Sequence, residues 1–350
     1  MKRILLVIGT RPQIIKSAPT IKEAVNWPDI EFLIVHTGQH YDYLMSEEFF
    51  REFSLPDPVV NLGVGSGPRD WQISQMLSGL ENVYKKFAPD LVLIPGDTNS
   101  TFAGGLSAAR RGIPLAHTES GARSFDWNMP EEVNRVVVDH ISNLLFAPTS
   151  DCVQNLLHEG LSENRISLVG DQMYEILQQH IDVIRTRNSR KKFGLMTSYG
   201  VVTIHRPENE TRLSNIISAL NQIDIPLIFP CHPGTKLSLR KFSLRKEIKV
   251  VDPIPYIDML SLLNDADILF TDSGGLQKEA FWLGTPCITL RNSTEWLDTI
   301  RAGANILVGD NTELILEEAS RRIGKRILPG KTSLNASEII IQRLNEWEPS

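Results

Sequence analysis

The sequence has few cysteines, no long apolar run and no excess of positive charge. Cys152, Cys231 and Cys287 are widely spaced and form no C-x-x-C pair, which favours reduced core thiols over disulfides or zinc ligands. No stretch approaches the roughly 18 apolar residues of a membrane span, and residues 1–5 lead directly into a predicted strand, without the hydrophobic region of a signal peptide. The formal charge of -6 gives no electrostatic footprint for nucleic acid or an anionic membrane. These absences predict a cytoplasmic protein that binds neither nucleic acid nor membranes.

Length and the order of predicted elements indicate an α/β chain with two domains. At 350 residues the chain exceeds the size at which single hydrophobic cores stop growing. Strand-like runs alternate with helical patterns from end to end, which is typical of parallel sheets covered by helices. We therefore predict a first domain over residues 1–170, joined by a C-terminal helical segment at 336–350, and a second domain over residues 190–335. The predicted strands are 3–8, 31–36, 91–95, 115–118, 144–148, 166–169, 200–204, 226–230, 248–251, 268–271, 287–290 and 306–308, and the clearest helices are 13–24, 72–86, 98–110, 131–141 and 336–347.

Polar motifs follow buried strands in both halves. Gly96-Asp97-Thr98 follows the strand at 91–95, and Asp272-Ser273-Gly274-Gly275 follows the strand at 268–271. Open parallel sheets bind ligands at the carboxyl ends of their strands. The sequence therefore predicts two sheets whose binding edges face one cleft.

The second-half motif predicts a phosphate site. Ser273 is a good N-cap, and Gly274 and Gly275 would let a diphosphate approach the first amides of the following helix. Glu279, one turn further on, could accept both hydrogen bonds of a ribose diol. The alternative is an ordinary capped helix with Glu279 exposed.

A second anion site is predicted at the beginning of the chain. Gly9-Thr10-Arg11-Pro12 follows the first strand and opens a helix, so Arg11 and the amides of the first turn could grip phosphate. The alternative is a turn in which Arg11 only forms a surface pair.

Three carboxylates of the first half are candidates for proton transfer: Asp97, Glu119 and Glu131. Carboxylates brought together raise each other's proton affinity, which supplies a base and an acid near neutral pH. Alternatively, Asp97 is an N-cap, and Glu131 with Glu132 forms an acidic first helical turn after a proline.

Basic strand ends of the second half could provide an anion-binding wall. His205 and Arg206 follow the strand at 200–204, and His232 follows the next strand. A lone histidine at such a position is more often a structural hydrogen-bonding group. The basic run at 185–192 is interpreted as a solvated helix end and linker. No histidine pair has the H-E-x-x-H spacing, so we predict no metal site.

Six motifs occur in a fixed order along the chain. They are Gly9-Thr10-Arg11-Pro12, His36-Thr37-Gly38-Gln39-His40-Tyr41-Asp42, Gly96-Asp97-Thr98-Asn99-Ser100-Thr101, Met129-Pro130-Glu131-Glu132-Val133-Asn134-Arg135, Thr203-Ile204-His205-Arg206-Pro207-Glu208-Asn209 and Thr271-Asp272-Ser273-Gly274-Gly275. Jointly they resemble the UDP-N-acetylglucosamine 2-epimerase family, over residues 1 to about 309.

The resemblance implies two Rossmann-like domains of the glycosyltransferase B type, with parallel sheets facing an interdomain cleft that binds a UDP-sugar, and it implies a homodimer. It also implies a mechanism without a cofactor. A carboxylate removes the proton at C2 while UDP leaves C1, which gives an enzyme-held 2-acetamidoglucal, and protonation at the other face with return of UDP gives the C2 epimer. Removing this poorly acidic hydrogen is feasible only if fixed donors stabilise the charge that moves onto the diphosphate.

The resemblance assigns roles to individual positions. The assigned residues are Asp97, Glu119 and Glu131 for acid and base chemistry, His205 and Arg11 for the departing diphosphate, Lys16, Arg135 and His232 for substrate binding, and Ser273, Gly274, Gly275 and Glu279 for UDP.

Within the family, the motifs point to two subgroups that act on different UDP-sugars. Thr294-Glu295-Trp296-Leu297-Asp298 replaces the family's common Thr-Glu-Arg-Pro-Glu. Together with Arg11-Pro12-Gln13, Gly170-Asp171-Gln172-Met173 and Gln277-Lys278-Glu279-Ala280-Phe281, it resembles the subgroup that epimerises UDP-2,3-diacetamido-2,3-dideoxyglucuronate. The primary prediction is a non-hydrolysing epimerase that converts UDP-N-acetylglucosamine to UDP-N-acetylmannosamine. Alternatives are that subgroup's reaction, a hydrolysing epimerase, a glycosyltransferase of the same fold and a catalytically silent UDP-sugar-binding protein.

Overall fold

The computed structural model describes residues 1–39, 49–205, 212–231, 233–327 and 335–348. The chain divides into two compact units, one comprising Met1–Ile176 with Thr332–Ser350 and the other comprising Leu177–Lys331. The predicted α/β fold with two parallel sheets is confirmed, because each unit contains its own parallel sheet.

The sheet of the first unit has seven strands in the order β3-β2-β1-β4-β5-β6-β7, and all pairs are parallel. Its central strands are covered on both faces, which explains why they are continuous apolar runs without alternation. The short β3 was not predicted, because two residues cannot display a period. The strands are β1 Lys2–Ile8, β2 Ile30–His36, β3 Val60–Asn61, β4 Leu91–Pro95, β5 Leu115–Thr118, β6 Leu144–Ala147 and β7 Ile166–Leu168.

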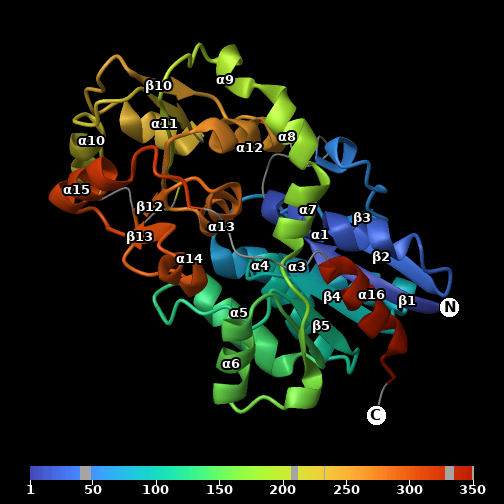
Figure 1. Cartoon of the computed structure of the whole chain (residues 1–350). Coiled ribbons are helices and arrows are strands. Elements are labelled where there is room, and N and C mark those ends of the chain that lie inside the picture. Colours follow the sequence, from blue (N-terminus) through green and yellow to red (C-terminus); the bar gives the residue numbers. More distant parts are fainter. Residues whose placement is uncertain (40–48, 206–211, 232, 328–334, 349–350) are drawn as a thin grey trace. The chain divides into compact units, whose positions relative to one another are not determined.

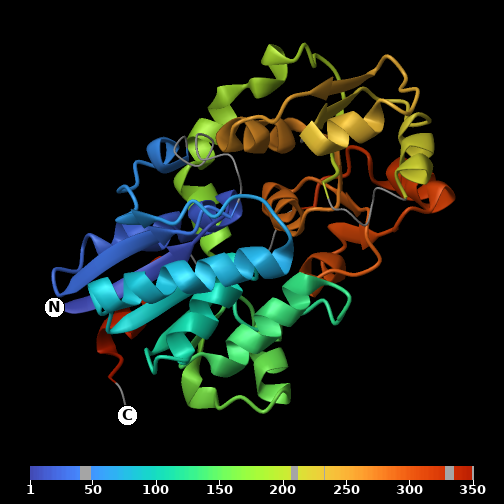
Figure 2. The same cartoon turned by 180° about the vertical axis from the view of Figure 1, so that it is seen from behind.

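Helices cover both faces of this sheet. α1 packs beside α16 on one face (Figure 1), whereas α3, α4 and α5 follow one another across the other face (Figure 2). Lys2 ties the C-terminal helix to β1, since its Nζ donates to the carbonyl of Asn345 at 2.8 Å. The helices are α1 Arg11–Ala24, α3 Arg69–Phe87, α4 Asn99–Ala109, α5 Pro130–Ile141, α6 Ser150–His158, α7 Gln172–Gln179 and α16 Ala336–Glu346, with a short 3-10 helix at Glu163–Arg165.

The second unit repeats this architecture with a six-stranded parallel sheet in the order β10-β9-β8-β11-β12-β13. In it α8, α9 and α13 all pack against α12, and α10 packs against α15 (Figure 1). Its strands are β8 Gly200–Thr203, β9 Leu227–Pro230, β10 Ile248–Val251, β11 Ile268–Thr271, β12 Cys287–Thr289 and β13 Asn305–Leu307. Its helices are α8 Ile181–Arg187, α9 Ser189–Lys192, α10 Leu213–Leu220, α11 Pro233–Leu239, α12 Tyr256–Asp265, α13 Gly274–Leu283, α14 Leu297–Arg301 and α15 Thr312–Arg322.

Each sheet reverses its strand order at one place. In the first sheet β1 lies between β2 and β4, and in the second β8 lies between β9 and β11. The loops that follow the two strands at such a reversal diverge to opposite faces and leave room for a ligand. Four of the six motifs follow β1 and β4 in one unit and β8 and β11 in the other, so these four lie at the switch points.

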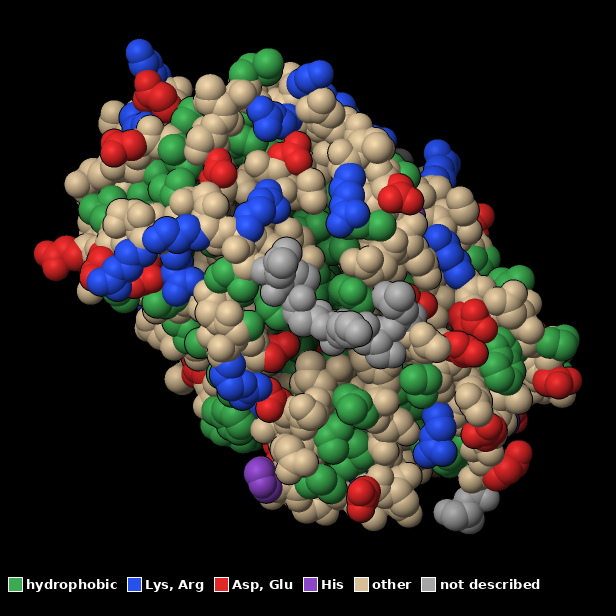
Figure 3. Space-filling model, in the orientation of Figure 1, with side chains coloured by type: hydrophobic (Ala, Val, Ile, Leu, Met, Phe, Trp, Pro, Cys, Tyr) green, Lys and Arg blue, Asp and Glu red, His purple; other side chains and the backbone are tan. Residues whose placement is uncertain are grey.

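Three further features are the absence of a membrane-spanning helix, the state of the cysteines and the distribution of charged side chains. Among the described residues, no helix is long and apolar enough to cross a membrane. All three cysteines are buried and none forms a disulfide. Basic and acidic side chains are interspersed over most of the face in view in Figure 3.

Candidate active site

Gln13 joins the two switch-point loops of the first unit. Its Oε1 accepts a hydrogen bond from the Gly9 amide at 2.9 Å, and its Nε2 donates to the Pro95 carbonyl at 2.8 Å. Gly9 is required by close packing, because a Cβ at this position would lie 1.9 Å from Thr37 Oγ1. The ends of β1 and β4 are thereby fixed relative to each other.

Asp97 follows β4 and is held by α5. Its carboxylate forms an ion pair with Arg135, and its carbonyl accepts from Asn134 Nδ2 at 2.9 Å. The alternative that Asp97 caps the next helix is wrong, because Thr98 is the N-cap and shares a capping box with Thr101. Asp97 is therefore available for another role at the sheet edge.

Arg135 is itself buried and oriented by Glu132. Its Nη1 lies 2.9 Å from Glu132 Oε2, and the same oxygen accepts from Ser124 N and Ser124 Oγ, each at 2.9 Å. The other oxygen accepts from Phe125 N at 2.9 Å. The sequence interpretation treated Glu132 only as part of an acidic helical turn, and the burial of the side chain depends on tertiary contacts that no local pattern reveals.

Glu119 follows β5 in a left-handed backbone conformation, with φ 67°. A non-glycine residue in this region costs of the order of 1 kcal/mol and must be held by its surroundings. The carboxylate forms an ion pair with Lys16 of α1. A Cβ at Gly96 would lie 3.4 Å from Glu119 Oε2, so the Asp97 loop and Glu119 are neighbours.

A small pocket adjoins Glu119 within the first unit. Lys16 and Glu119 line it together with the segment that opens α7. The other lining residues are Thr118, Phe146, Pro148, Val169, Gly170, Asp171, Gln172 and Met173.

A network of buried charged side chains joins β5 to the loop that follows β4. His117 on β5 contacts Asp139 through Nδ1 at 2.7 Å and the Gly96 carbonyl through Nε2 at 2.7 Å. Asp139 also accepts from Gly121 N at 3.0 Å and from Arg123 at 2.8 Å. Burial opposes ionisation of Asp139, but His117 and Arg123 outweigh it and hold its pKa below the ordinary value.

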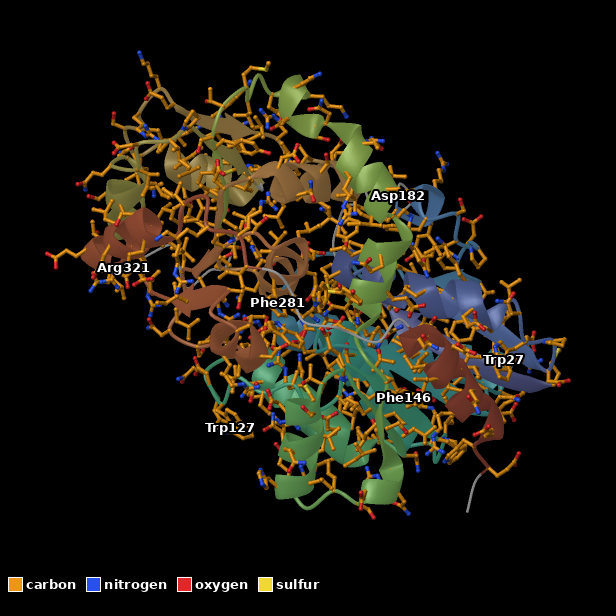
Figure 4. The ribbon with its side chains drawn as sticks, viewed as in Figure 1. Trp27, Trp127, Phe146, Asp182, Phe281 and Arg321 are labelled. Atoms are coloured by element: carbon orange, nitrogen blue, oxygen red, sulfur yellow. The ribbon has the colours of Figure 1, made fainter. Side chains whose placement is uncertain are left out.

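Glu131 lies in the first turn of α5, as predicted, and in the described part of the chain its side chain has no hydrogen bond or ion pair. The preceding loop exposes two aromatic side chains, Phe125 at 64% and Trp127 at 65%. Figure 4 shows Trp127 projecting outward beside α5, whereas Phe146 lies within the sheet. The three candidate carboxylates thus differ in setting, since two are ion-paired and one is half-exposed.

Arg11 begins α1 as predicted, and its guanidinium lies 4.7 Å from the centroid of the Phe49 ring. Arg11 is half-buried beside this ring. The phosphate-binding role and the alternative of a surface pair both stay predictions. His40 and its neighbours in the second motif lie outside the described residues.

In the second unit, Ser273 caps α13 as predicted. Its hydroxyl accepts from Leu276 N, and its own amide donates to Thr271 Oγ1 at 3.0 Å. A Cβ on Gly274 would lie 2.5 Å from Glu295 Oε1, so the glycine permits a close approach by this chain's own Glu295. Glu295 is buried and pairs with Arg291 at 3.1 Å.

Glu279 is buried on α13, where its Oε1 accepts from the Tyr256 hydroxyl at 2.8 Å. The alternative that Glu279 is exposed is therefore wrong, because α12 covers this face of α13. Lys278 beside it is also buried, with Nζ 3.7 Å from the centroid of the Trp296 ring. Trp296 is one of the residues at which this sequence departs from the family's common Thr-Glu-Arg-Pro-Glu motif.

His205 follows β8, and its Nδ1 lies 2.9 Å from Asp272 Oδ1. Arg206 and His232, the other basic residues predicted for this edge, lie outside the described residues. No group of three or more histidine, cysteine, aspartate or glutamate side chains in the described part of the chain could hold a metal ion.

The structure thus brings Asp97, Glu119, Lys16 and Arg135 together in one unit and His205, Asp272 and Ser273 together in the other. The first set can move a proton, since it presents carboxylates at a ligand-binding edge. The second presents a histidine and the amides of a capped helix, groups that bind phosphate.

Comparison with known proteins agrees with this chemistry. A family model described as UDP-N-acetylglucosamine 2-epimerase matches residues 22–338. The chain is 42% identical over 341 residues to a UDP-N-acetylglucosamine 2-epimerase of Methanocaldococcus jannaschii, covering 93% of each protein. It is 40% identical over 335 residues to the UDP-2,3-diacetamido-2,3-dideoxy-D-glucuronate 2-epimerase of Pseudomonas aeruginosa, again covering 93% of each. A crystal structure of the M. jannaschii UDP-GlcNAc 2-epimerase in complex with UDP-GlcNAc and UDP is similar with a TM-score of 0.91 and 41% identity, covering 99% of each chain.

Proposed function

Since this chain belongs to the UDP-N-acetylglucosamine 2-epimerase family, we propose that it converts UDP-N-acetylglucosamine to UDP-N-acetylmannosamine without net hydrolysis. The family consists of UDP-sugar 2-epimerases, so the chain is an isomerase. The observation that carries the proposal is the pair of carboxylates at the carboxyl edge of the first sheet, where Asp97 follows β4 and Glu119 follows the neighbouring β5. Glu119 is fixed there by Lys16, and Asp97 is fixed by Arg135.

The first unit supplies the proton transfers in this proposal. One of the carboxylates Asp97, Glu119 and Glu131 removes the C2 proton, and the C–H electrons form a double bond between C1 and C2. The C1–O bond breaks at the same time, and its electrons leave with UDP. A second carboxylate then delivers a proton to the opposite face of C2, and UDP returns to C1. Ion pairs keep two of these carboxylates, Asp97 and Glu119, in a fixed orientation, which such transfers require.

The second unit binds the nucleotide in this proposal. Ser273 caps α13 and leaves the amides of Gly274 and Gly275 directed at the diphosphate. His205 of this unit stabilises the negative charge that develops as UDP leaves, since donors aimed at developing charge lower the barrier most. The same role is proposed for Arg11, which begins α1 in the first unit. Tyr256 orients the Glu279 carboxylate for the ribose hydroxyls. In the first unit, Arg135 contributes to substrate binding by holding the Asp97 carboxylate, and Lys16 contributes by holding the Glu119 carboxylate.

The second candidate substrate is UDP-2,3-diacetamido-2,3-dideoxyglucuronate. The relative that acts on it is 40% identical to this chain, close to the 42% of the UDP-N-acetylglucosamine enzyme, so overall identity does not separate them. The segment Thr294-Glu295-Trp296-Leu297-Asp298, which resembles that subgroup, supports the second candidate. We retain UDP-N-acetylglucosamine as the primary substrate and test both.

The test incubates the purified chain with each UDP-sugar in water enriched in oxygen-18, identifies the products by proton NMR and measures oxygen-18 in the sugar by mass spectrometry. The proposal expects the C2 epimer of UDP-N-acetylglucosamine, with UDP still attached. Free sugar carrying oxygen-18 at C1 would instead establish the hydrolysing reaction, and turnover restricted to the diacetamido glucuronate would establish the second substrate. Absence of any C2 epimer with either sugar contradicts the proposal.

A cytoplasmic location and a homodimer complete the proposal. Three buried cysteines without a disulfide support the first, since reducing compartments keep thiols free. Resemblance to the family supports the second.

A further inference from the structure

Asp272 is a completely buried carboxylate at the end of β11. Its oxygens lie 3.2 and 3.0 Å from the backbone nitrogen of His205, which donates to them, and Oδ1 lies 2.9 Å from His205 Nδ1. Its amide donates to the Thr203 carbonyl at 3.3 Å. Asp272 thus contacts both the main chain and the ring of the residue that follows the neighbouring strand.

This contact determines which ring nitrogen of His205 faces outward. Nδ1 is engaged by Asp272, whereas the side chain as a whole is 52% exposed. A carboxylate accepts and does not donate, so this ion-pair contact of 2.9 Å favours a hydrogen on Nδ1. Nε2 is then the ring nitrogen available to a ligand, and turning the ring would take Nδ1 away from a buried charge.

We propose that Asp272 is a positioning residue that holds the His205 ring with Nδ1 protonated and Nε2 directed at the diphosphate. The inference rests on the proposed function and assigns a role to the one residue of the Asp272-Ser273-Gly274-Gly275 motif that had none. A carboxylate in this position also stabilises a positive ring, so Nε2–H can donate as charge builds on the leaving group. Loss of the carboxylate would leave the ring present but without the group that orients it and that stabilises its positive form.

The same pair of strands offers a matched control. Asp267 precedes β11 just as Asp272 follows it, and its amide donates to the Tyr199 carbonyl at 2.9 Å. Its Oδ2 accepts from Tyr199 N at 3.2 Å and from Ser198 Oγ at 2.6 Å. Asp267→Asn therefore removes an equivalent strand-end carboxylate at the edge of the sheet opposite His205.

The experiment compares wild type, Asp272→Asn and Asp267→Asn. Nitrogen-15 labelling of histidine reports the protonation of each ring nitrogen by NMR, and His205→Gln identifies the His205 signals. We expect Nδ1–H in the wild type and in Asp267→Asn. In Asp272→Asn the amide can donate to Nδ1, so the hydrogen should move to Nε2. Turnover of Asp272→Asn should fall roughly 10- to 100-fold in kcat, with KM changed less than about threefold.

The wild-type spectrum alone can overturn the inference. A wild-type His205 whose Nδ1 lacks a hydrogen at the assay pH contradicts it, even if Asp272→Asn does not fold. Equal kcat values for Asp272→Asn and Asp267→Asn, with unchanged tautomers, contradict it as well. Because NMR needs no turnover, a failed proposed function appears separately, as a wild type without epimerisation.

Discussion

Glu132 shows how one buried side chain can orient a reacting group that it does not touch. Its carboxylate receives four hydrogen bonds, three from the backbone and hydroxyl of the loop at 124–125 and one from Arg135. Arg135 in turn contacts Asp97. The position of the loop at 124–125 and the orientation of the Arg135 guanidinium therefore depend on the Glu132 carboxylate. Through Arg135, the orientation of Asp97 depends on it as well.

Replacing Glu132 with glutamine should disturb both stability and turnover. The amide nitrogen of Glu132→Gln would face donors where an oxygen accepts now, so we expect the free energy of unfolding to fall by about 1–3 kcal/mol. With Arg135 misplaced, kcat should fall about tenfold. Urea denaturation and steady-state kinetics measure the two effects. Glu313→Gln, an exposed residue of the first turn of α15, is the matched control and should change neither. Equal behaviour of the two variants would contradict this account.

For individual residues, the sequence predicted which side chains lie at strand and helix ends better than it predicted what each side chain contacts. Ser273 was predicted as a cap because a helix start is a local signal, whereas Asp97 was assigned a possible capping role that Thr98 takes. The roles of Glu132 and Asp272 were not predicted, because each depends on a partner brought close only by folding. A polar residue's burial is a property of the tertiary structure.

Asp258 connects three helices of the second unit. It lies on α12 and pairs with Arg187 of α8 at 2.8 Å and with Lys192 of α9 at 2.9 Å. Burial would raise its pKa, but these two cations and the Ser189 hydroxyl outweigh burial and hold the pKa well below the ordinary value of 3.8. The basic run at 185–192 is therefore not simply a solvated linker, because three of its residues, Arg187, Ser189 and Lys192, bind a buried carboxylate.

This contact predicts a pH-dependent stability. A carboxylate with a depressed folded-state pKa stabilises the fold fully above its unfolded-state pKa, and the contribution is lost as pH falls toward the folded-state pKa. Asp258→Asn should therefore lower the free energy of unfolding at pH 7 by about 1–3 kcal/mol. Its difference from wild type should shrink below about pH 4. Urea titrations at both pH values measure this, with the exposed Asp224→Asn as the control. A difference that is unchanged or larger at low pH would contradict the assignment.

The bounds of the strands were easier to predict from the sequence than the contacts between helices. β4, β5, β10 and β11 have the predicted bounds, because buried strands of parallel sheets are short apolar runs ended by polar residues. The two-residue β3 was missed for lack of a pattern. The ion pairs that join α8 and α9 to α12 also follow from packing, which alternating hydrophobicity does not encode.

At the scale of the whole molecule, two units use the same construction for different chemistry. Each places its polar motifs after the two strands where the order of its sheet reverses. The first unit presents Asp97 there, with Glu119 after the neighbouring β5, and the second presents a histidine and a capped helix. The motifs along the sequence indicated this division because strand ends in a parallel sheet can be read from local apolar runs.

The central claim is that carboxylates of the first unit exchange the hydrogen at C2 while UDP departs. The most direct test is to incubate UDP-N-acetylglucosamine with the chain in deuterium oxide and to follow C2 by proton NMR. We predict that deuterium enters C2 of both epimers, and that Asp97→Asn and Glu119→Gln each slow this exchange by about 100-fold or more while UDP still binds. Accumulation of the epimer with its original hydrogen still at C2, or wild-type exchange by both variants, would contradict the claim.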